Sequence, residues 1–538
     1  MTNHTRQAVK FAVLIIRHSK IHLMRLFYLF IFFIATIGTS YAQNNCLPNG
    51  VKFNRQRQID SFSIYFPTCV NILGDVLIED FENSEITDLS GLAQIKNIGG
   101  NLSILNNDSL ANLSGFESLL DIKGRVEIKN NASLLNISAL LNLKRIDGGL
   151  GIQNNPKLSS LSGLQILESL EDSLFISSNA GLVSLDGINN LKSVKGKVRI
   201  HNNVTLESIT GLSNLTEVLG LAIDSNTILK TLNGLQGLKT IKNGLRIRNN
   251  NGLQNTSAIS SLASIEGDIV ISFNDAMTTL NLESIGKIQG NLEVRDNTNL
   301  VNLILSDLVE ISNNLTISKN DGLASLAGFD NLTSIGGNVR IFNNQRLETL
   351  AGLQKVSTVG GSLGVGSCNN LQNLSALTNI MSISDTLAIF GNDKLTSLAG
   401  IENIDATSIT ALLISGNQNL ATCEVKSICD YLKIPQSKAI ISNNDTRCNS
   451  RNQIEMSCQT SNVVDGTEDK FKITPNPSNT FINVSGLEAN KDFVLLDVLG
   501  KVVMYGVLSE GGQIDISVLD NGLYFIKIGY KTLSVVKI

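Results

Sequence analysis

Asparagine recurs along this chain at a nearly constant spacing of 24 residues. The series consists of Asn107, Asn131, Asn155, Asn179, Asn203, Asn226, Asn250, Asn274, Asn297, Asn320, Asn344, Asn392 and Asn417. Cys368 stands where the series would place one further asparagine. Around each position the chain repeats the pattern Leu-x-Ile-x-Asn-Asn-x-x-Leu-x-x-Leu-x-Gly-Leu-x-x-Leu-x-x-Ile-x-Gly. A fixed period of about 20 to 50 residues is the mark of a repeat array, so we expect a solenoid.

Each repeat begins with a Leu-x-Ile segment, whose two apolar side chains are two positions apart. This alternation predicts a short strand with one buried face. The apolar residues that follow are spaced by three, but Gly and Asn interrupt each stretch, which is too brief for a stable helix. We therefore expect turns and further short strands there. The glycines that close the pattern predict corners with positive φ. They are Gly100, Gly124, Gly148, Gly196, Gly220 and Gly244.

A single repeat cannot bury its own apolar side chains, so neighbouring repeats must stack as rungs. The expected fold class is all-β, a right-handed parallel β-solenoid. In this geometry the repeated asparagine lies inward at a corner, where it can bond the turn amides of its own rung and the next. Cys368 is expected to occupy the same column as a small buried thiol.

Composition agrees with a repeat and excludes one class of partner. At 538 residues the chain exceeds one ordinary hydrophobic core, and it has no Trp and 6 Pro. The formal net charge is -4 with 17% charged residues, which gives no basic field. We expect no nucleic-acid partner.

The repeats resemble two related families. Their Leu-x-Ile-x-x-Asn core is similar to a leucine-rich repeat, and Leu-x-x-Ile-x-Gly-x-Leu-x-Ile resembles the receptor L domain of the insulin and epidermal growth factor receptors. The segment from Cys69 to Ile78 is similar to the start of an L domain. The resemblance spans Cys69 to Cys458. For the domain organisation, we expect an N-terminal cap at 43–75 and L-domain-like repeats at 76–421. Leu110 follows Asn107 after two residues instead of one, which favours a straighter, β-helix-like rod over a horseshoe.

The N-terminus predicts export. Basic residues precede the apolar run Leu26 to Ile37, and the small residues Ser40 and Ala42 fit cleavage before Gln43. The alternative is a membrane anchor, but about a dozen apolar residues are too few to span a bilayer. We expect a signal peptide at 1–42 and no integral membrane span.

Cysteines flank the repeats, as expected for an exported solenoid whose end rungs need caps. We expect a bridge between Cys46 and Cys69, while the four C-terminal cysteines allow three pairings. Those four, within a cap at 422–458, are Cys423, Cys429, Cys448 and Cys458. No Cys-x-x-Cys pair or nearby His suggests a metal site. Glu424 to Leu432, with Thr422 as N-cap, could form a short capping helix.

A polar stretch at 459–470 predicts a linker, and alternating strands after it predict a small antiparallel β-sandwich at 471–538. These last residues resemble the type A C-terminal sorting domain of the Bacteroidetes type IX secretion system. The matching segments are Pro475 to Pro477, Asp497 to Lys501, Leu519 to Tyr524 and Val535 to Ile538. The resemblance implies passage across the outer membrane by type IX machinery, and a secreted or outer-membrane cell-surface location. The alternative is a generic adhesive β-domain.

The chain shows no catalytic, metal-binding or cofactor motif. His201 is the only His downstream of the expected cleavage site and has no partnered nucleophile. The enzymatic alternative is a β-helix polysaccharide lyase, which needs carboxylates on adjacent rungs. The outward acids Glu127, Asp224 and Glu293 are several rungs apart. We therefore expect no enzyme.

The outward positions of several strands carry arginine, on alternate rungs that are about 10 Å apart. This stripe comprises Arg199, His201, Arg246, Arg248, Arg295, Arg340 and Phe342, with Phe175 and Phe390 beside it. It predicts either a docking strip for an anionic protein or glycan, or a face that only keeps the protein soluble. The leading hypothesis is a cell-surface binding or adhesion scaffold. The alternatives are a carbohydrate-active β-helix enzyme and an inert structural surface protein.

Overall fold

The computed structural model describes residues 44–80, 85–464, 472–487, 490–498, 500–509, 511–528 and 531–538. The expected signal peptide at 1–42 lies outside these residues. The chain divides into two compact units, Met1–Glu455 and Met456–Ile538, which we describe separately.

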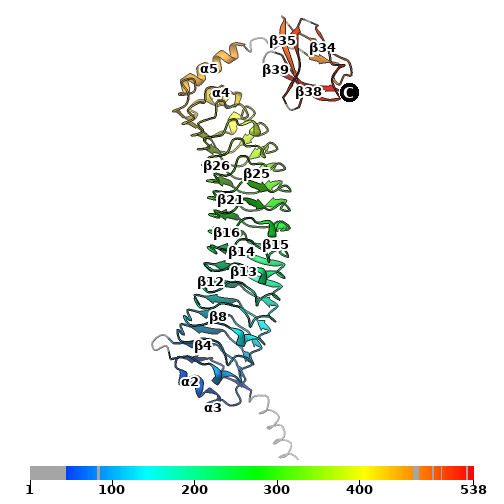
Figure 1. Cartoon of the computed structure of the whole chain (residues 1–538). Coiled ribbons are helices and arrows are strands. Elements are labelled where there is room, and N and C mark those ends of the chain that lie inside the picture. Colours follow the sequence, from blue (N-terminus) through cyan, green and yellow to red (C-terminus); the bar gives the residue numbers. More distant parts are fainter. Residues whose placement is uncertain are drawn as a thin grey trace, which may run out of the picture. The chain divides into compact units, whose positions relative to one another are not determined.

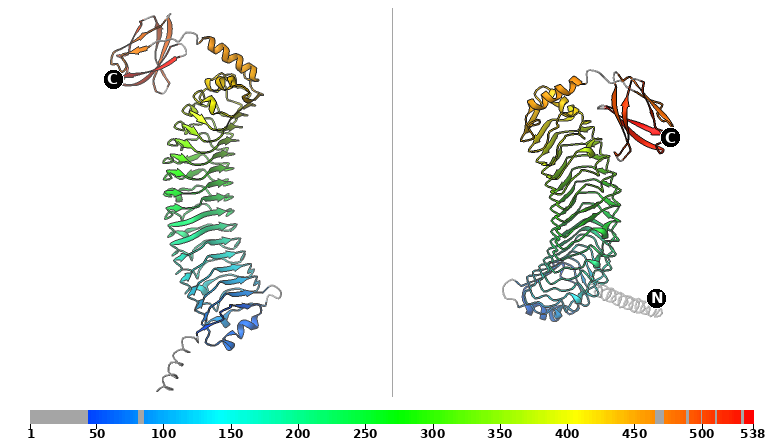
Figure 2. Two further views of the ribbon diagram at one scale, coloured as in Figure 1. Left: turned by 180° about the vertical axis from the view of Figure 1, so that it is seen from behind. Right: turned by 45° about the horizontal axis from the view of Figure 1, so that its top comes forward.

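The first unit is a parallel β-solenoid of about 16 turns, which confirms the expected fold class. Its rungs stack in one gently bent column (Figures 1 and 2). The Leu-x-Ile segments form its main ladder of parallel strands. They are β2 (Val51–Phe53), β4 (Val76–Glu79), β6 (Leu102–Leu105), β8 (Val126–Lys129), β10 (Leu150–Gln153), β12 (Leu174–Ser177), β13 (Ser193–His201), β14 (Glu217–Asp224), β16 (Leu245–Arg248), β18 (Ile269–Ser272), β21 (Leu292–Arg295), β24 (Leu315–Ser318), β26 (Val339–Phe342), β28 (Leu363–Gly366), β30 (Thr386–Phe390), β31 (Ala411–Ser415) and β32 (Lys438–Ser442).

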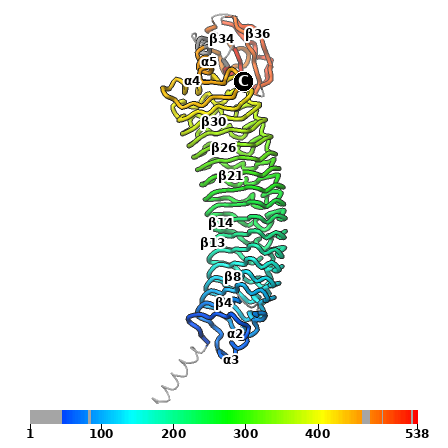
Figure 3. Tube along the Cα trace, turned by 90° about the vertical axis from the view of Figure 1, so that its left-hand side faces the viewer, coloured from blue at the N-terminus to red at the C-terminus, as the bar shows by residue number. Residues whose placement is uncertain are grey.

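A second parallel ladder of short strands follows the end of each repeat, and β13 and β14 run through both ladders. Its other members are β1 (Asn45–Cys46), β3 (Asn71–Ile72), β5 (Asn97–Ile98), β7 (Asp121–Ile122), β9 (Arg145–Ile146), β11 (Ser169–Leu170), β15 (Thr240–Ile241), β17 (Ser264–Ile265), β20 (Lys287–Ile288), β23 (Glu310–Ile311), β25 (Ser334–Ile335), β27 (Thr358–Val359) and β29 (Ser382–Ile383). Figure 3 shows the rungs edge-on, one above another.

The third side of each rung consists mainly of turns. Two short strands, β19 (Thr279–Asn281) and β22 (Asn302–Ile304), pair there. Within the described residues, six rungs carry a single 3₁₀ turn, at η1 (Ser90–Leu92), η2 (Ser138–Leu140), η3 (Thr210–Leu212), η4 (Ser257–Ile259), η5 (Ser375–Leu377) and η6 (Ala406–Ser408). Stretches of this length cannot hold a regular α-helix, as the sequence indicates.

The core lies between the ladders and is built from aligned columns of apolar side chains. Ile104 pairs with Ile128, and Ile128 with Ile152, and each is fully buried. Leu110 and Leu113 are equally buried on the turn side of the same rung. Stacking therefore supplies the burial that one repeat lacks.

The asparagine column is a buried ladder in which Cys368 takes the place of one asparagine. Asn131 Oδ1 accepts bonds from the backbone N–H and the Nδ2 of Asn107, each at 3.0 Å. Asn131 Nδ2 donates to Ile104 O at 3.0 Å in the same preceding rung. The residue before each ladder position has positive φ, as at Asn106 with φ 58°. This left-handed conformation is easiest for Asn and Gly, which explains why Asn so often occurs twice in succession.

The prediction of positive φ at the closing glycines is wrong at five of the six positions, since only Gly244 has it (φ +83°). At four of the five, Gly100, Gly124, Gly148 and Gly196, the preceding rung is too close for a side chain, whereas at Gly220 the nearest atom is Asn243 O of the following rung, at 3.1 Å from a Cβ. A Cβ at Gly124 would lie 2.7 Å from Asn101 N, and one at Gly148 would lie 2.7 Å from Arg125 N. Positive φ occurs instead at the glycines of the Leu-x-Gly-Leu segment, such as Gly115 (φ +118°).

The N-terminal end of the solenoid holds two short helices, α2 (Gln56–Asp60) and α3 (Phe62–Tyr65). Cys46 is joined to Cys69, and β1 pairs with β3. Ile59 and Phe62 are buried in this cap.

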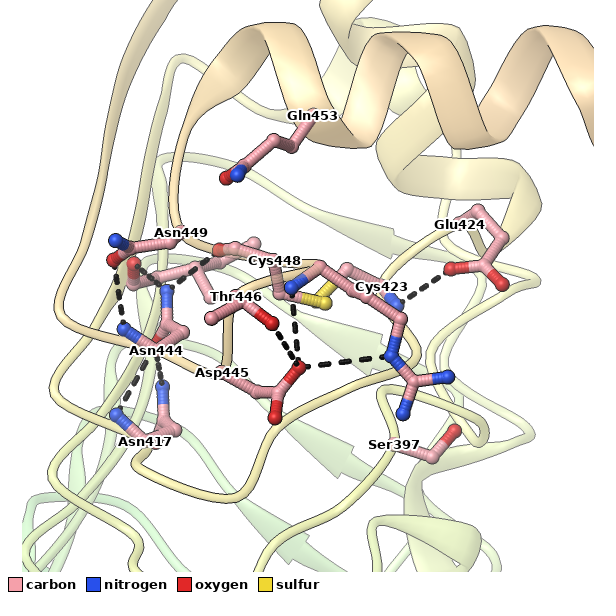
Figure 4. The surroundings of a disulfide bond; sticks show 12 residues. Ser397, Asn417, Cys423, Glu424, Asn444, Asp445, Thr446, Cys448, Asn449 and Gln453 are labelled. Atoms are coloured by element: carbon pink, nitrogen blue, oxygen red, sulfur yellow. Dashed lines mark hydrogen bonds and ion pairs between the residues drawn. A yellow bond between two sulfur atoms is a disulfide. The ribbon is translucent and has the colours of Figure 1, made fainter.

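The C-terminal cap contains α4 (Lys426–Lys433) and the disulfide between Cys423 and Cys448 (Figure 4). Cys429 and Cys458 are also disulfide-bonded. Thr422 does not cap α4, because the helix begins after Val425, whose side chain forms no capping bond. The asparagine ladder continues to Asn444, whose Oδ1 accepts from Asn417 N at 3.0 Å. Asn444 N donates to Asn449 Oδ1, as Figure 4 shows.

The helix α5 (Arg451–Val464) crosses the boundary between the units and includes residues 459–464, which the sequence assigns to a linker. Residues 459–464 include no Gly or Pro to stop a helix. Residues 465–470, the rest of the expected linker, lie outside the described residues.

The second unit contains two small antiparallel sheets, as expected for 471–538. One sheet consists of β33 (Lys472–Thr474), β34 (Phe481–Ser485) and β37 (Gln513–Asp515). The other consists of β35 (Lys491–Leu496), β36 (Val502–Leu508), β38 (Gly522–Ile528) and β39 (Lys531–Lys537). Ile482, Leu495 and Ile526 are fully buried in their shared core.

Candidate functional site

The outward side chains of the main ladder form one face of the solenoid, which we call the strand face. Each rung contributes two columns to it, and the strand register places every residue of the predicted stripe there. The first column reads Arg199, Ala222, Arg246, Val270, Glu293, Thr316, Arg340. The second reads His201, Asp224, Arg248, Ser272, Arg295, Ser318, Phe342.

Arg246 is engaged inside the protein. Its Nε donates to Asp224 Oδ1 at 2.9 Å, and Nη2 bonds the other carboxylate oxygen. The Asp224 side chain is only 6% exposed, whereas that of Arg246 is 43% exposed. Hydrogen bonds to Asp224 raise the pKa of Arg246. This arginine therefore neutralises a buried carboxylate, and little of its charge remains for a ligand.

Arg295 is engaged in the same way. It donates to the carboxylate of Glu293 and, at 2.9 Å, to Asp296 Oδ2. The bond to Glu293 is the main cause of the raised pKa of Arg295. Lys319 also lies 3.6 Å from Asp296 Oδ1. The local charges cancel at this point of the strand face.

The other three arginines of the stripe, Arg199, Arg248 and Arg340, are exposed. Among the described residues, none of the three has an acidic partner within ion-pairing distance. Arg248 follows Arg199 by two rungs and Arg340 follows Arg248 by four, or about 10 Å and 19 Å along the axis. The structure thus sorts the stripe into paired, half-buried arginines and exposed ones.

Phe273 is a residue of the strand face that the sequence analysis missed. The guanidinium carbon of Arg248 lies 5.4 Å from its ring centroid, and that of Arg295 lies 4.8 Å from it. Phe273 has φ 56° in a column otherwise held mostly by Asn, Ser and Gly. A bulky residue in this conformation is an outlier, and the ring orients two neighbouring guanidinium groups. Its position just before a ladder asparagine was the available signal.

His201 contributes no fixed charge at neutral pH. Burial lowers its pKa first, and the nearby positive charge of Arg199 lowers it further. Its Nδ1 is buried without a hydrogen-bond partner, as is the hydroxyl of Ser272. Because these two atoms have no hydrogen-bond partner, this arrangement does not make a base of His201 or a nucleophile of Ser272.

An aromatic pair follows Arg340 on the strand face. The ring centroids of Phe342 and Phe390 are 5.4 Å apart, with 42° between the ring planes. Both rings lie over β28, whose outward residues are Gly364 and Gly366. The sequence places Phe342 in the stripe and Phe390 beside it, but it gives no sign that the glycines between them matter.

The outward acids considered for catalysis are not gathered together. Asp224 and Glu293 each bond an arginine, and Glu127 lies on β8, four rungs before Asp224. Within the described residues, no three His, Cys, Asp or Glu side chains are grouped as metal ligands.

The structure defines an all-β solenoid with a separate C-terminal β-domain, and comparisons with known families agree. The receptor L domain model matches residues 68–160, and the secretion system C-terminal sorting domain model matches residues 472–538. Neither is an enzyme family. The sorting domain indicates secretion or attachment to the cell surface and interaction with the secretion machinery. A search of curated proteins gives no match. Of the helices that the structure describes, none combines the length and apolar character needed to cross a bilayer.

Proposed function

We propose that this protein is a type IX-exported recognition scaffold of a Bacteroidetes cell, and that its strand face binds an extended anionic ligand. In this proposal residues 1–42 are removed as a signal peptide, 471–538 direct export, and the solenoid between them is displayed. The observation that carries the proposal is the set of three exposed arginines without acidic partners on one face. Unpaired, exposed guanidinium groups in a row attract and orient an extended anion.

The alternatives explain less of this arrangement. A lyase would need free carboxylates near one another, whereas Asp224 and Glu293 are both bound by arginine. An inert spacer needs a charged surface for solubility. It does not need Phe273 to hold guanidinium groups in place at the cost of an unfavourable backbone conformation.

The test compares binding of the secreted protein and its variants to immobilised poly-L-glutamate and polygalacturonate. A triple variant, Arg199→Gln with Arg248→Gln and Arg340→Gln, should weaken binding to at least one polymer several fold. Added salt should weaken binding of the unaltered protein as well. The matched control removes three exposed lysines outside the strand face, Lys144→Gln, Lys230→Gln and Lys239→Gln, and should bind normally. Equal weakening in both triple variants would show that only net charge matters and would reject the strand face.

A further inference from the structure

The face beyond Arg340 differs from the part before it. From β26 to β32 the two columns continue as Arg340, Gly364, Ala388, Leu413, Ile440 and as Phe342, Gly366, Phe390, Ser415, Ser442, and Arg340 is the charged side chain in this part of them. The next charged outward side chain is Lys438, which begins β32 four rungs further on. All four residues of β28 are buried although half of them point outward. The outward side of β28 is therefore covered by other side chains, namely the rings of Phe342 and Phe390.

Glycine is required beneath these rings. A Cβ at position 364 would lie 2.8 Å from Cζ of Phe342, and one at position 366 would lie within 2.6 Å of three atoms of the Phe390 ring. Contacts that short do not occur between real side chains, so any larger residue would push the rings off the strand. The glycines allow both rings to lie against the outward face of β28, Phe342 from the neighbouring strand β26 and Phe390 from the neighbouring strand β30.

We propose that Phe342 and Phe390 form an aromatic platform that binds one sugar ring of an acidic polysaccharide, with Arg340 binding the carboxylate of that sugar or its neighbour. The face of an aromatic ring carries negative potential and receives the polarised C–H groups on the flat side of a pyranose. Arg340 lies on the same strand as Phe342 and two rungs from Phe390, within one or two sugar lengths of the platform.

This inference rests on the proposed function and selects among its anionic ligands. The strand face is only two outward residues wide, which suits a single extended chain. An acidic polypeptide could bind the arginines. Its side chains offer no flat C–H surface that would stack on the Phe342 and Phe390 rings. The platform and the exposed arginine together fit a polymer that is both ringed and anionic.

The decisive experiment measures binding of the full secreted protein to polygalacturonate and to poly-L-glutamate of matched charge number. The double variant Phe342→Leu with Phe390→Leu keeps an apolar cover over β28 but removes both rings. It should bind polygalacturonate roughly 3- to 10-fold more weakly and poly-L-glutamate as before. Phe175→Leu, which alters an outward ring on β12, is the matched control and should change neither affinity. Phe342→Tyr keeps the ring and should retain the affinity for polygalacturonate. This variant provides a second measurement in case the double variant has a folding defect.

The outcomes separate the two proposals. If the double variant binds both polymers as the unaltered protein does, or loses both equally, the platform is only a structural cover. If the protein binds poly-L-glutamate but not polygalacturonate, the sugar inference fails while anion binding by the strand face stands. If it binds neither polymer, both proposals fail.

Discussion

At the scale of single residues, the buried asparagine ladder holds successive rungs together. Asn250 accepts a bond from Asn226 N at 3.0 Å and donates to Ile223 O at 2.8 Å and Arg248 O at 3.1 Å. The bonds to Asn226 N and Ile223 O are buried, so water cannot replace a lost partner there.

Replacing Asn250 by alanine should therefore lower the free energy of unfolding by roughly 1 to 3 kcal/mol, because buried amide and carbonyl groups lose their partners. Denaturant unfolding of the secreted protein would measure the change. The exposed neighbour Asn251 provides the control, since Asn251→Ala should have an effect of less than about 0.5 kcal/mol. Similar losses for the two variants would contradict the role of the ladder.

Cys368 replaces asparagine in this column and should remain a thiol. Burial raises its pKa from 9.0 to about 11. The folded state thus favours the protonated form, so its contribution to stability is complete below about pH 9 and is lost as the pH rises toward 11. We expect Cys368 to resist iodoacetamide at pH 8 in the folded protein and to react after denaturation, as measured by mass spectrometry. Rapid labelling of the folded protein would show that the thiol is accessible. Within the described residues it is the free cysteine.

At the scale of strands, the pairing of Arg246 with Asp224 distinguishes two arginines that the sequence treats alike. Arg246→Ala leaves a buried carboxylate without its cation and should cost about 2 kcal/mol of stability. Arg248→Ala removes a contact with Phe273 only and should cost less than about 1 kcal/mol. Thermal unfolding of the two single variants tests this difference.

The same comparison has a binding readout with the opposite order. Arg248→Ala should weaken binding to an acidic polymer more than Arg246→Ala does, because only Arg248 is exposed and unpaired among the two. If Arg246→Ala has the larger effect on binding and none on stability, the assignment of roles is wrong.

At the scale of the whole molecule, the C-terminal β-domain has its own apolar core, and none of its described strands belongs to the solenoid ladders. A reporter fused in front of residues 471–538 should leave a cell that has type IX machinery and should be found in the medium or at the surface. Ile526 is fully buried in the domain core, so Ile526→Asp should unfold the domain and leave the reporter in the periplasm. Export of both fusions alike would show that the folded domain is not the signal.

The sequence by itself determined the features that depend on local spacing. The period of 24 residues, the two-residue alternation of Leu-x-Ile and the repeated asparagine suffice for stacked rungs, because each rung repeats the same contacts with its neighbours. The matched motifs after residue 471 were equally local. The role of each glycine was harder to predict. Gly115 permits positive φ and Gly124 permits close approach of the neighbouring rung, but the two look alike in sequence.

Only the tertiary structure decided which charges on the strand face are available. Arg246 and Arg248 differ in role because the register places Asp224 beside them and burial directs its carboxylate to Arg246. Likewise, Phe342 and Phe390 are 48 positions apart in the chain, and their rings meet only because β28 between them carries glycine at both outward positions. Pairing and packing across rungs depend on distances between side chains, and those distances arise only when the rungs are stacked.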